Sequence, residues 1–355
     1  MVISTGATQN VHCGANVCKA TATDAVLNAT ALAGMLASGD VKVVAGNGAS
    51  DIAVGAPFSW TAATTLTLQA YGGITFANTV SVAGPGGITL TTNVGGAGGD
   101  FSFVGKGKIT FWDLTGQLTI NGERYRLVAG ISGLAAAVQE KPSGNYALTA
   151  DYDASSDGTY PASPVPTAVK GKIEGLGNTV SHLTIKDTST AENTETALFS
   201  SNAGVIRDLR ISAIKAAGGY EGDLAGLVAL NSGRIRNVSV TGTLTGGRRT
   251  DMIGGVAGSN TGNWNKNTAF VENASFAGKI AGRGYDGGVV GYNYYGAISG
   301  ASASGSTEGA IAGGVVGGNW GGSVGYSHAN SAISGPGEQA LLGGVAGLST
   351  GPITH

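Results

Sequence analysis

Charge, cysteine and long hydrophobic runs are all scarce in this sequence of 355 residues. Charged residues make up 12% of it, the net charge is −2, and the basic side chains are scattered. Nucleic-acid binding requires a basic patch, so no nucleic-acid partner is expected. No run reaches the roughly 18 apolar residues of a membrane-spanning helix, so no membrane insertion is expected. The first ten residues lack the charged-then-apolar order of a signal peptide, which leaves a cytosolic protein or a piece of a longer exported chain.

The two cysteines favour the exported chain. Cys13 and Cys18 lie close together in "HCGANVC", a spacing that suits a local disulfide bond in an oxidising compartment. Free thiols are the second interpretation. A zinc site would need two more ligands, and only His12 is nearby.

Glycine, by contrast, is abundant, with 63 residues in a chain that is 42% hydrophobic. A disordered chain would be less hydrophobic and more charged, and collagen would have glycine at every third position. Short runs of Thr, Val, Ile and Ser lie between the glycines. This pattern predicts many short strands joined by tight turns.

One glycine-rich phrase recurs: "GGVAGSN" (254–260), "GGVVGYN" (287–293), "GGVVGGN" (313–319) and "GGVAGLS" (343–349). Aligned on the Asn that closes most copies, the repeats step by 29, 29, 33 and 26 residues. Self-similarity at this period indicates a solenoid, and the glycine density excludes helical repeats. The sequence therefore predicts an all-β fold, a single-stranded right-handed parallel β-helix. The aligned asparagines are Asn202, Asn231, Asn260, Asn293 and Asn319.

Stacking of coils explains each position of the phrase. Equivalent side chains of successive coils form rows about 4.8 Å apart, and Val suits an inward row. Glycine allows positive φ at corners and close approach between coils. Asn tolerates the left-handed region, and its amide can bond to the coils above and below. The phrase thus predicts a structural role.

Two segments break the strand rhythm. "NATALAGMLASG" predicts a short helix near 28–38, with Asn28 as its N-cap, and "ISGLAAAVQEKPSG" predicts another near 131–139. We expect both helices to lie on the periphery of the solenoid. Three segments follow: irregular coils over 1–122, a connecting module over 123–190, and the regular repeats over 191–355.

These residues resemble a known family. "GGVAG" and "GGVVG" resemble the GLUG repeat, and "GGITLTT", "ITFWDLTGQLTING" and "YRLVAGISGLAAAV" are similar to the passenger region of filamentous-haemagglutinin-like exoproteins. The resemblance implies a right-handed β-helix, two-partner secretion through an outer-membrane partner, and an adhesive role at the bacterial cell surface. It supplies no catalytic residues. Because the chain stops just inside a new repeat, we expect it to be a fragment that continues past His355.

Aromatic residues close to the repeat asparagines form the first candidate site. Stacking would gather them along one edge of successive coils, where rings could bind sugars or a partner. Alternatively, they cover the open edge and close packing gaps. The residues are Trp264, Tyr292, Tyr294, Tyr295 and Trp320.

Acidic residues offer two further candidates. Asp151, Asp153 and Asp157 alternate as in a calcium loop, but Ala162 stands where a bidentate Glu belongs, so a polar turn is the other interpretation. A glycosidase would need two acids flanking the scissile bond. Asp223, Asp251 and Asp286 precede repeats without forming an evident pair.

These observations favour a non-enzymatic, adhesive and structural segment of a secreted surface protein that binds a glycan or protein of a host or neighbouring cell. No cofactor is expected, with calcium at Asp151, Asp153 and Asp157 as the alternative. The alternative is a carbohydrate-binding or carbohydrate-active β-helix.

Overall fold

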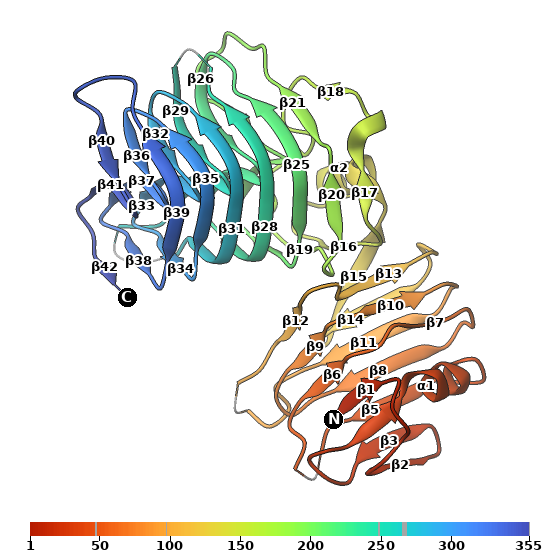
Figure 1. The fold of residues 1–355 in the computed structure, drawn as a ribbon. Helices are drawn as coiled ribbons and strands as arrows, with labels where there is room; N and C mark the ends of the chain where they lie inside the picture. The colour runs from red at the N-terminus through yellow and green to blue at the C-terminus, as the bar shows by residue number, and fades with distance from the viewer. Residues whose placement is uncertain (47, 97, 248, 265–267, 355) are drawn as a thin grey trace. The chain divides into compact units, whose positions relative to one another are not determined.

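The computed structural model confirms the predicted parallel β-solenoid: it is 53% strand and 6% helix, with about 12 turns and two short helices. It describes residues 1–46, 48–96, 98–247, 249–264 and 268–354, without the side chains of residues 250 and 251. The chain divides into two compact units (Figure 1). Unit 1 comprises Met1–Ala129, Asn145–Ala150 and Leu176–Asn178, and unit 2 comprises Gly130–Gly144, Asp151–Gly175 and Thr179–His355.

Unit 1 is built from coils of three short strands that stack into three sheets (Figure 1). One sheet contains β1 (Val2–Ser4), β4 (Val26–Asn28), β6 (Ile52–Val54), β9 (Ile74–Phe76) and β12 (Phe101–Phe103), and a second contains β7 (Phe58–Trp60), β10 (Thr79–Val82) and β13 (Lys108–Phe111). The third contains β2 (Val11–Gly14), β3 (Val17–Ala20), β5 (Val41–Val44), β8 (Thr65–Gln69), β11 (Gly87–Thr91) and β14 (Gln117–Ile120); β15 (Glu123–Val128) and β16 (Asn145–Leu148) follow.

Among the described strands of unit 1 the pairing is parallel except where β2 pairs with β3 and β14 pairs with β15, and an isolated antiparallel bridge joins Gln9 and Val26. Apolar and polar residues alternate along these strands, so that a strand such as β8 buries every second side chain inside the coil. Leu66 and Leu68 of β8 point inward and join a core that also contains Phe76. The helix α1 (Ala29–Leu36) begins at Asn28, whose side chain accepts a hydrogen bond from the Ala31 amide, so this predicted cap is confirmed.

Unit 2 also has three sheets. The long-strand sheet contains β19 (Lys172–Glu174), β20 (Thr179–Ser181), β21 (Thr184–Lys186), β24 (Val205–Arg207), β25 (Arg210–Ala217), β28 (Arg234–Thr245), β31 (Phe270–Ala281), β34 (Ala297–Ser299), β35 (Ser302–Glu308), β38 (Ser323–Gly325), β39 (His328–Ser334) and β42 (Ile353–Thr354), with β17 (Tyr152–Asp153) and β18 (Thr159–Tyr160) at its start.

Each repeat then turns a corner between two further sheets. The pre-corner sheet contains β22 (Thr194–Thr196), β26 (Glu221–Ala225), β29 (Arg249–Gly254), β32 (Tyr285–Gly287), β36 (Ile311–Gly313) and β40 (Leu341–Gly343). The post-corner sheet contains β23 (Phe199–Asn202), β27 (Val228–Asn231), β30 (Ala257–Thr261), β33 (Val290–Tyr294), β37 (Val316–Trp320) and β41 (Ala346–Ser349). Unit 2 also holds α2 (Gly130–Glu140), which buries Ile131, Leu134, Ala137 and Val138, and a 3-10 turn at Ala154–Ser156.

The recurring phrase has a more specific explanation than stacking. Its first and third glycines let the pre-corner and post-corner sheets pack backbone to backbone: a Cβ on Gly287 would lie 2.6 Å from the Gly317 nitrogen, and one on Gly291 would lie 2.7 Å from the Ile253 nitrogen. Its second glycine faces the long-strand sheet, since a Cβ on Gly288 would lie 2.6 Å from the Ala303 Cβ. The following valines are fully buried in the first three copies, as predicted, whereas Val345 of the last copy is only partly buried.

The prediction that these glycines, and the row asparagines, use the left-handed region is wrong. None of the glycines in the four described phrases has a positive φ, and none of the row asparagines has one. One row of left-handed positions lies at a corner of the long-strand sheet instead, and it includes Asn237 (φ 53°) and Asn273 (φ 49°). Their side chains are hydrogen bonded at 3.2 Å. Glycine is therefore needed in the phrase for space, not for dihedral freedom.

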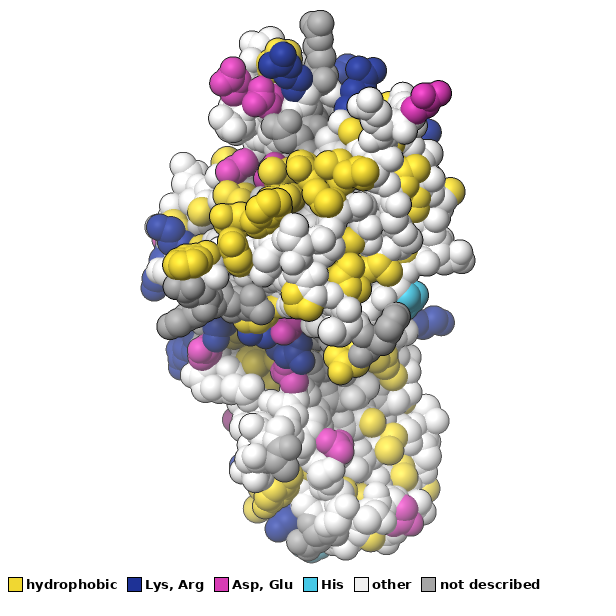
Figure 2. Space-filling model, turned by 90° about the vertical axis from the view of Figure 1, so that its left-hand side faces the viewer, with side chains coloured by type: hydrophobic (Ala, Val, Ile, Leu, Met, Phe, Trp, Pro, Cys, Tyr) yellow, Lys and Arg dark blue, Asp and Glu magenta, His cyan; other side chains and the backbone are white. Residues whose placement is uncertain are grey.

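Apolar rows are buried coil upon coil until the final repeat. Leu224, Ile253, Asp286 and Ala312 occupy one row of the pre-corner sheet and are fully buried, whereas Leu342, next in the row, is 48% exposed. Figure 2 looks onto the side where β39, β40 and β41 lie, and hydrophobic side chains form a band there. Each coil is thus covered by the coil that follows it.

Candidate functional site

A ladder of buried asparagines runs through the post-corner sheet. Each Nδ2 donates to the Oδ1 of the asparagine in the following coil at 2.7–2.8 Å, and the last donates to Ser349 Oγ at 2.9 Å. All of them are at most 2% exposed. The ladder holds the strand ends at a fixed spacing, so the residues that follow each asparagine lie on one edge of unit 2. Its members are Asn202, Asn231, Asn260, Asn293 and Asn319.

Three of the predicted aromatic residues form one cluster on this edge. The rings of Tyr292 and Tyr294 lie 6.2 Å apart and stacked, and the rings of Tyr294 and Tyr295 lie 4.7 Å apart, edge to face. Tyr285 completes the cluster, with its ring 5.0 Å from that of Tyr292. Such spacings are those of favourable aromatic pairs.

Part of this cluster covers the next coil. A Cβ on Gly318 would lie 2.6 Å from the Tyr285 ring and 2.9 Å from the Tyr292 ring. A Cβ on Gly321 would collide with the Tyr295 ring. The rings of Tyr285, Tyr292 and Tyr295 therefore rest on glycines of the following repeat, and burial raises the pKa of the Tyr292 hydroxyl.

The remaining aromatic residues face solvent. Trp264 is 73% exposed, Trp320 is 46% exposed and Tyr294 is 38% exposed. Tyr294 directly follows Asn293 and Trp320 directly follows Asn319, two asparagines that are paired in register. Trp264 lies in the turn beyond Thr261, which pairs with Tyr294. These three residues are the part of the edge that a ligand can reach, and we call them the exposed aromatic edge.

Tyr285 is not among the residues predicted from the sequence. It stands just before the phrase, in the pre-corner strand β32, and pairs with Met252 and Ile311 of the neighbouring coils. The alternative that aromatics only cover gaps thus applies to some of the rings, and Tyr285 is one of them. Alignment of the repeats places Tyr285 at an apolar row position, but its contact with Tyr292 depends on how the corner folds.

The three acidic residues of the calcium candidate bind protein groups in unit 2. The hydrogen bond with His182 and the Ser155 amide hold the pKa of Asp153 below its usual range. Among described residues, no group of three or more His, Cys, Asp or Glu is placed to hold a metal ion. The partners are the Thr179 amide for Asp151 (3.0 Å), His182 Nδ1 for Asp153 (2.9 Å), and the Tyr152 and Tyr160 hydroxyls for Asp157 (both 2.6 Å).

The acids before the repeats differ in environment. Asp223 accepts a hydrogen bond from the Ser259 hydroxyl at 2.7 Å. Asp286 is fully buried, and within the described part of the chain neither of its oxygens has a hydrogen-bond partner. Burial raises its pKa to about 8; the nearby Gly284 amide, which is outside hydrogen-bonding geometry, offsets part of that rise, and the Glu308 carboxylate adds to it. The side chain of Asp251 lies outside the described residues.

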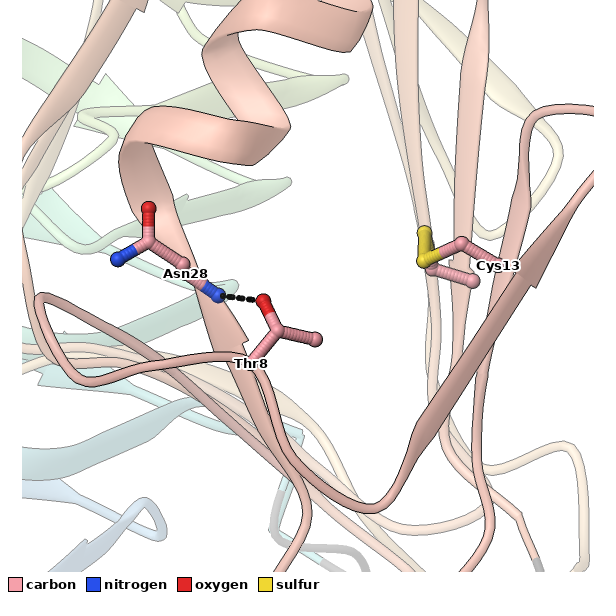
Figure 3. The surroundings of a disulfide bond; sticks show 4 residues. Thr8, Cys13 and Asn28 are labelled. Carbon is pink, nitrogen blue, oxygen red and sulfur yellow. Dashed lines mark hydrogen bonds between the residues drawn. A yellow bond between two sulfur atoms is a disulfide. The ribbon is translucent and has the colours of Figure 1, made fainter.

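A disulfide bond joins Cys13 and Cys18 across the β2–β3 hairpin of unit 1 (Figure 3). The two residues are opposite each other in the register, with Cα atoms 4.0 Å apart, and Cys18 is fully buried. Near the hairpin, the backbone amide of Asn28 donates a hydrogen bond to Thr8 Oγ1 at 3.0 Å (Figure 3). The chain therefore has the disulfide that suits an oxidising compartment.

Comparison with known proteins gives one partial similarity. Over 127 residues the chain is 35% identical to halomucin of Haloquadratum walsbyi (strain DSM 16790 / HBSQ001). The matched region covers 32% of this chain and 1% of halomucin. The chain thus spans about one hundredth of the length of that relative. No family model and no solved structure matches the chain. Among the described helices, none is long and apolar enough to cross a membrane.

Proposed function

We propose that this chain is a structural, non-enzymatic segment of a large secreted or cell-surface protein, and that it attaches to glycans through its exposed aromatic edge. The observation that carries the proposal is the position of Tyr294 and Trp320, solvent-facing rings one residue beyond a buried asparagine ladder. The ladder holds the backbone that carries these rings at a fixed spacing before a ligand binds, which lowers the backbone entropy lost on binding.

Other observations support parts of the proposal. The β-solenoid suits a structural surface segment, and the similarity to a short part of halomucin is consistent with a surface or secreted protein. The disulfide agrees with an oxidising compartment. Two-partner secretion from a bacterium, implied by the resemblance to filamentous-haemagglutinin-like exoproteins, is part of the proposal.

A glycan array tests attachment. The wild-type chain should bind a subset of glycans, and a Trp264→Ala, Tyr294→Ala, Trp320→Ala variant should lose that binding while its circular dichroism spectrum stays unchanged, because all three rings are exposed. Stacking of a ring on a sugar face is the interaction removed.

The same array distinguishes the non-enzymatic proposal from the alternative, a carbohydrate-active enzyme. Bound glycans are recovered and analysed by mass spectrometry after prolonged incubation. A carbohydrate-active enzyme would shorten them, whereas the proposal requires them to be intact. Retained binding by the folded variant would contradict an aromatic recognition surface.

A further inference from the structure

A second surface of unit 2 has the features of a binding site. An open groove of about 330 Å³ lies on the outer face of the long-strand sheet, where β21, β25 and β28 run side by side. Ile185 and Ala216, which also line it, are buried and point into the core. The outer face of the groove is therefore strand backbone, the Ala217 methyl group and the threonine side chains. The lining residues are Thr184, Ile185, Lys186, Lys215, Ala216, Ala217, Thr243 and Thr245.

Register places lysines and threonines in one row across this groove. Thr184 pairs with Lys215, Lys215 with Thr243, and Thr243 with Lys279 of the neighbouring strand β31. Because neighbouring strands lie roughly 4.8 Å apart, Lys215 and Lys279 stand roughly 10 Å apart along the row. Lys186 lies two residues further along its strand, beside this row.

The lysines are available to a ligand. Lys186, Lys215 and Lys279 are all exposed. Within the described residues, none of the three forms an ion pair. Glu308 is an exposed acid at the border of this surface, in the row of Thr245 and two strands beyond it. Asp187, which follows Lys186, is buried and accepts hydrogen bonds from the Thr196 hydroxyl and the Ser189 amide. The groove is thus a cationic surface interrupted by hydroxyl groups.

We propose that this groove binds a linear polysaccharide that carries carboxylates, extended across β21, β25, β28 and β31. The lysine ammonium groups would pair with uronate carboxylates, and the hydroxyls of Thr184, Thr243 and Thr245 would exchange hydrogen bonds with sugar hydroxyls. A sugar residue in an extended chain advances by a length close to the spacing of the coils, so charges on alternate sugars match lysines two strands apart.

The observations favour a polysaccharide over other anionic chains. Single-stranded nucleic acid is typically bound by aromatic stacking platforms, and no aromatic ring is among the residues that line this groove. An acidic peptide would gain main-chain hydrogen bonds at a sheet edge, whereas the groove lies on a sheet face. This site is separate from the exposed aromatic edge and does not rest on the proposed adhesive function.

Binding to immobilised polygalacturonate, measured by biolayer interferometry at two salt concentrations, tests the proposal. The Lys215→Glu, Lys279→Glu variant should bind at least tenfold more weakly than the wild type. The control is Lys106→Glu, Lys170→Glu, which changes the net charge equally at two other exposed lysines and should stay within twofold. Higher salt should weaken wild-type binding, because the pairs are exposed.

A second variant, Thr243→Val, Thr245→Val, keeps the charge and removes two hydroxyls. It should weaken polygalacturonate binding at least threefold, an effect that general attraction of polyanions would not produce. Neutral dextran should not bind. Equal loss in the control variant, full binding by the threonine variant, or equally tight binding of single-stranded DNA or polyglutamate would overturn the proposal. The exposed-aromatic variant should bind polygalacturonate normally, so failure here leaves the adhesive function untouched.

Discussion

At the scale of single residues, buried polar groups specify how the coils stack. The row asparagines are the clearest case, because each amide donates to the next coil and also to a backbone carbonyl of its own turn, as Asn293 does to Gly296 at 3.0 Å. A buried amide without these partners would be costly, so a slipped register is strongly disfavoured. The sequence could predict this ladder because one residue type recurs at nearly regular spacing after a repeated phrase.

Breaking one rung should destabilise unit 2. In Asn293→Ala the two hydrogen bonds donated by Asn293 are lost, and the Asn260 amide loses its acceptor. We expect the free energy of unfolding to fall by about 3 kcal/mol, measured by urea denaturation. The control, Asn330→Ala, removes an exposed asparagine and should change it by less than about 0.5 kcal/mol. A loss below about 1 kcal/mol for Asn293→Ala would mean that the ladder is not stabilising.

Asp286 makes the stability depend on pH. Its pKa is about 8 in the folded chain, against the ordinary value of 3.8 for an Asp carboxyl in water. Between these values the folded state keeps a proton that the unfolded state has lost, so the free energy of unfolding falls as pH rises from about 4 to about 8 and then levels off. Below the lower value both states are protonated, and the effect is absent.

The variant Asp286→Asn should remove this dependence. From about pH 5 to about pH 7 the wild type should lose about 2 to 3 kcal/mol more stability than the variant, because one pKa unit corresponds to about 1.4 kcal/mol. Urea denaturation at the two pH values gives the difference. Parallel pH profiles for the two proteins would show that Asp286 is ionised and solvated in the folded state.

At the scale of elements, the phrase positions two sheets in direct backbone contact. Strand alternation and both short helices could be predicted, because they depend on local periodicity and on a cap such as Asn28. The contact between the pre-corner and post-corner sheets could not be predicted, because local periodicity does not show that the strands on the two sides of the corner fold onto each other. The contact between Tyr285 and Tyr292 was missed for the same reason.

Equivalent glycines provide a matched test of this packing. A Cβ on Gly288 would collide with the Gly314 carbonyl and press on the Ala303 side chain, whereas a Cβ on Gly344, the same position in the last repeat, would meet nothing within 4 Å. Gly288→Ala should therefore lower the free energy of unfolding by more than about 2 kcal/mol, and Gly344→Ala should leave it nearly unchanged. Thermal and urea denaturation of both variants measure this, and equal effects would contradict close sheet packing.

At the scale of the whole molecule, the chain is two solenoid units with their own cores. Unit 1 includes Asn145–Ala150 and Leu176–Asn178, two short segments from far along the chain. Such interleaving leaves no signature in composition or periodicity, so the sequence offers no way to predict it. Ligand recognition depends on the surface of unit 2. There the same repeats supply aromatic rings that cover glycines of the next coil and other aromatic rings that face solvent.

The separation of these two kinds of ring is the central claim, and one measurement tests it. The glycan dissociation constant and the melting temperature are determined for Tyr294→Ala, Trp320→Ala and for Tyr285→Ala, a ring that covers Gly318. We predict that the first variant binds at least tenfold more weakly and that its melting temperature falls less than that of Tyr285→Ala, because Tyr294 loses ring contacts at the surface whereas Tyr285 covers the next coil. Unchanged glycan affinity in the first variant would contradict the account.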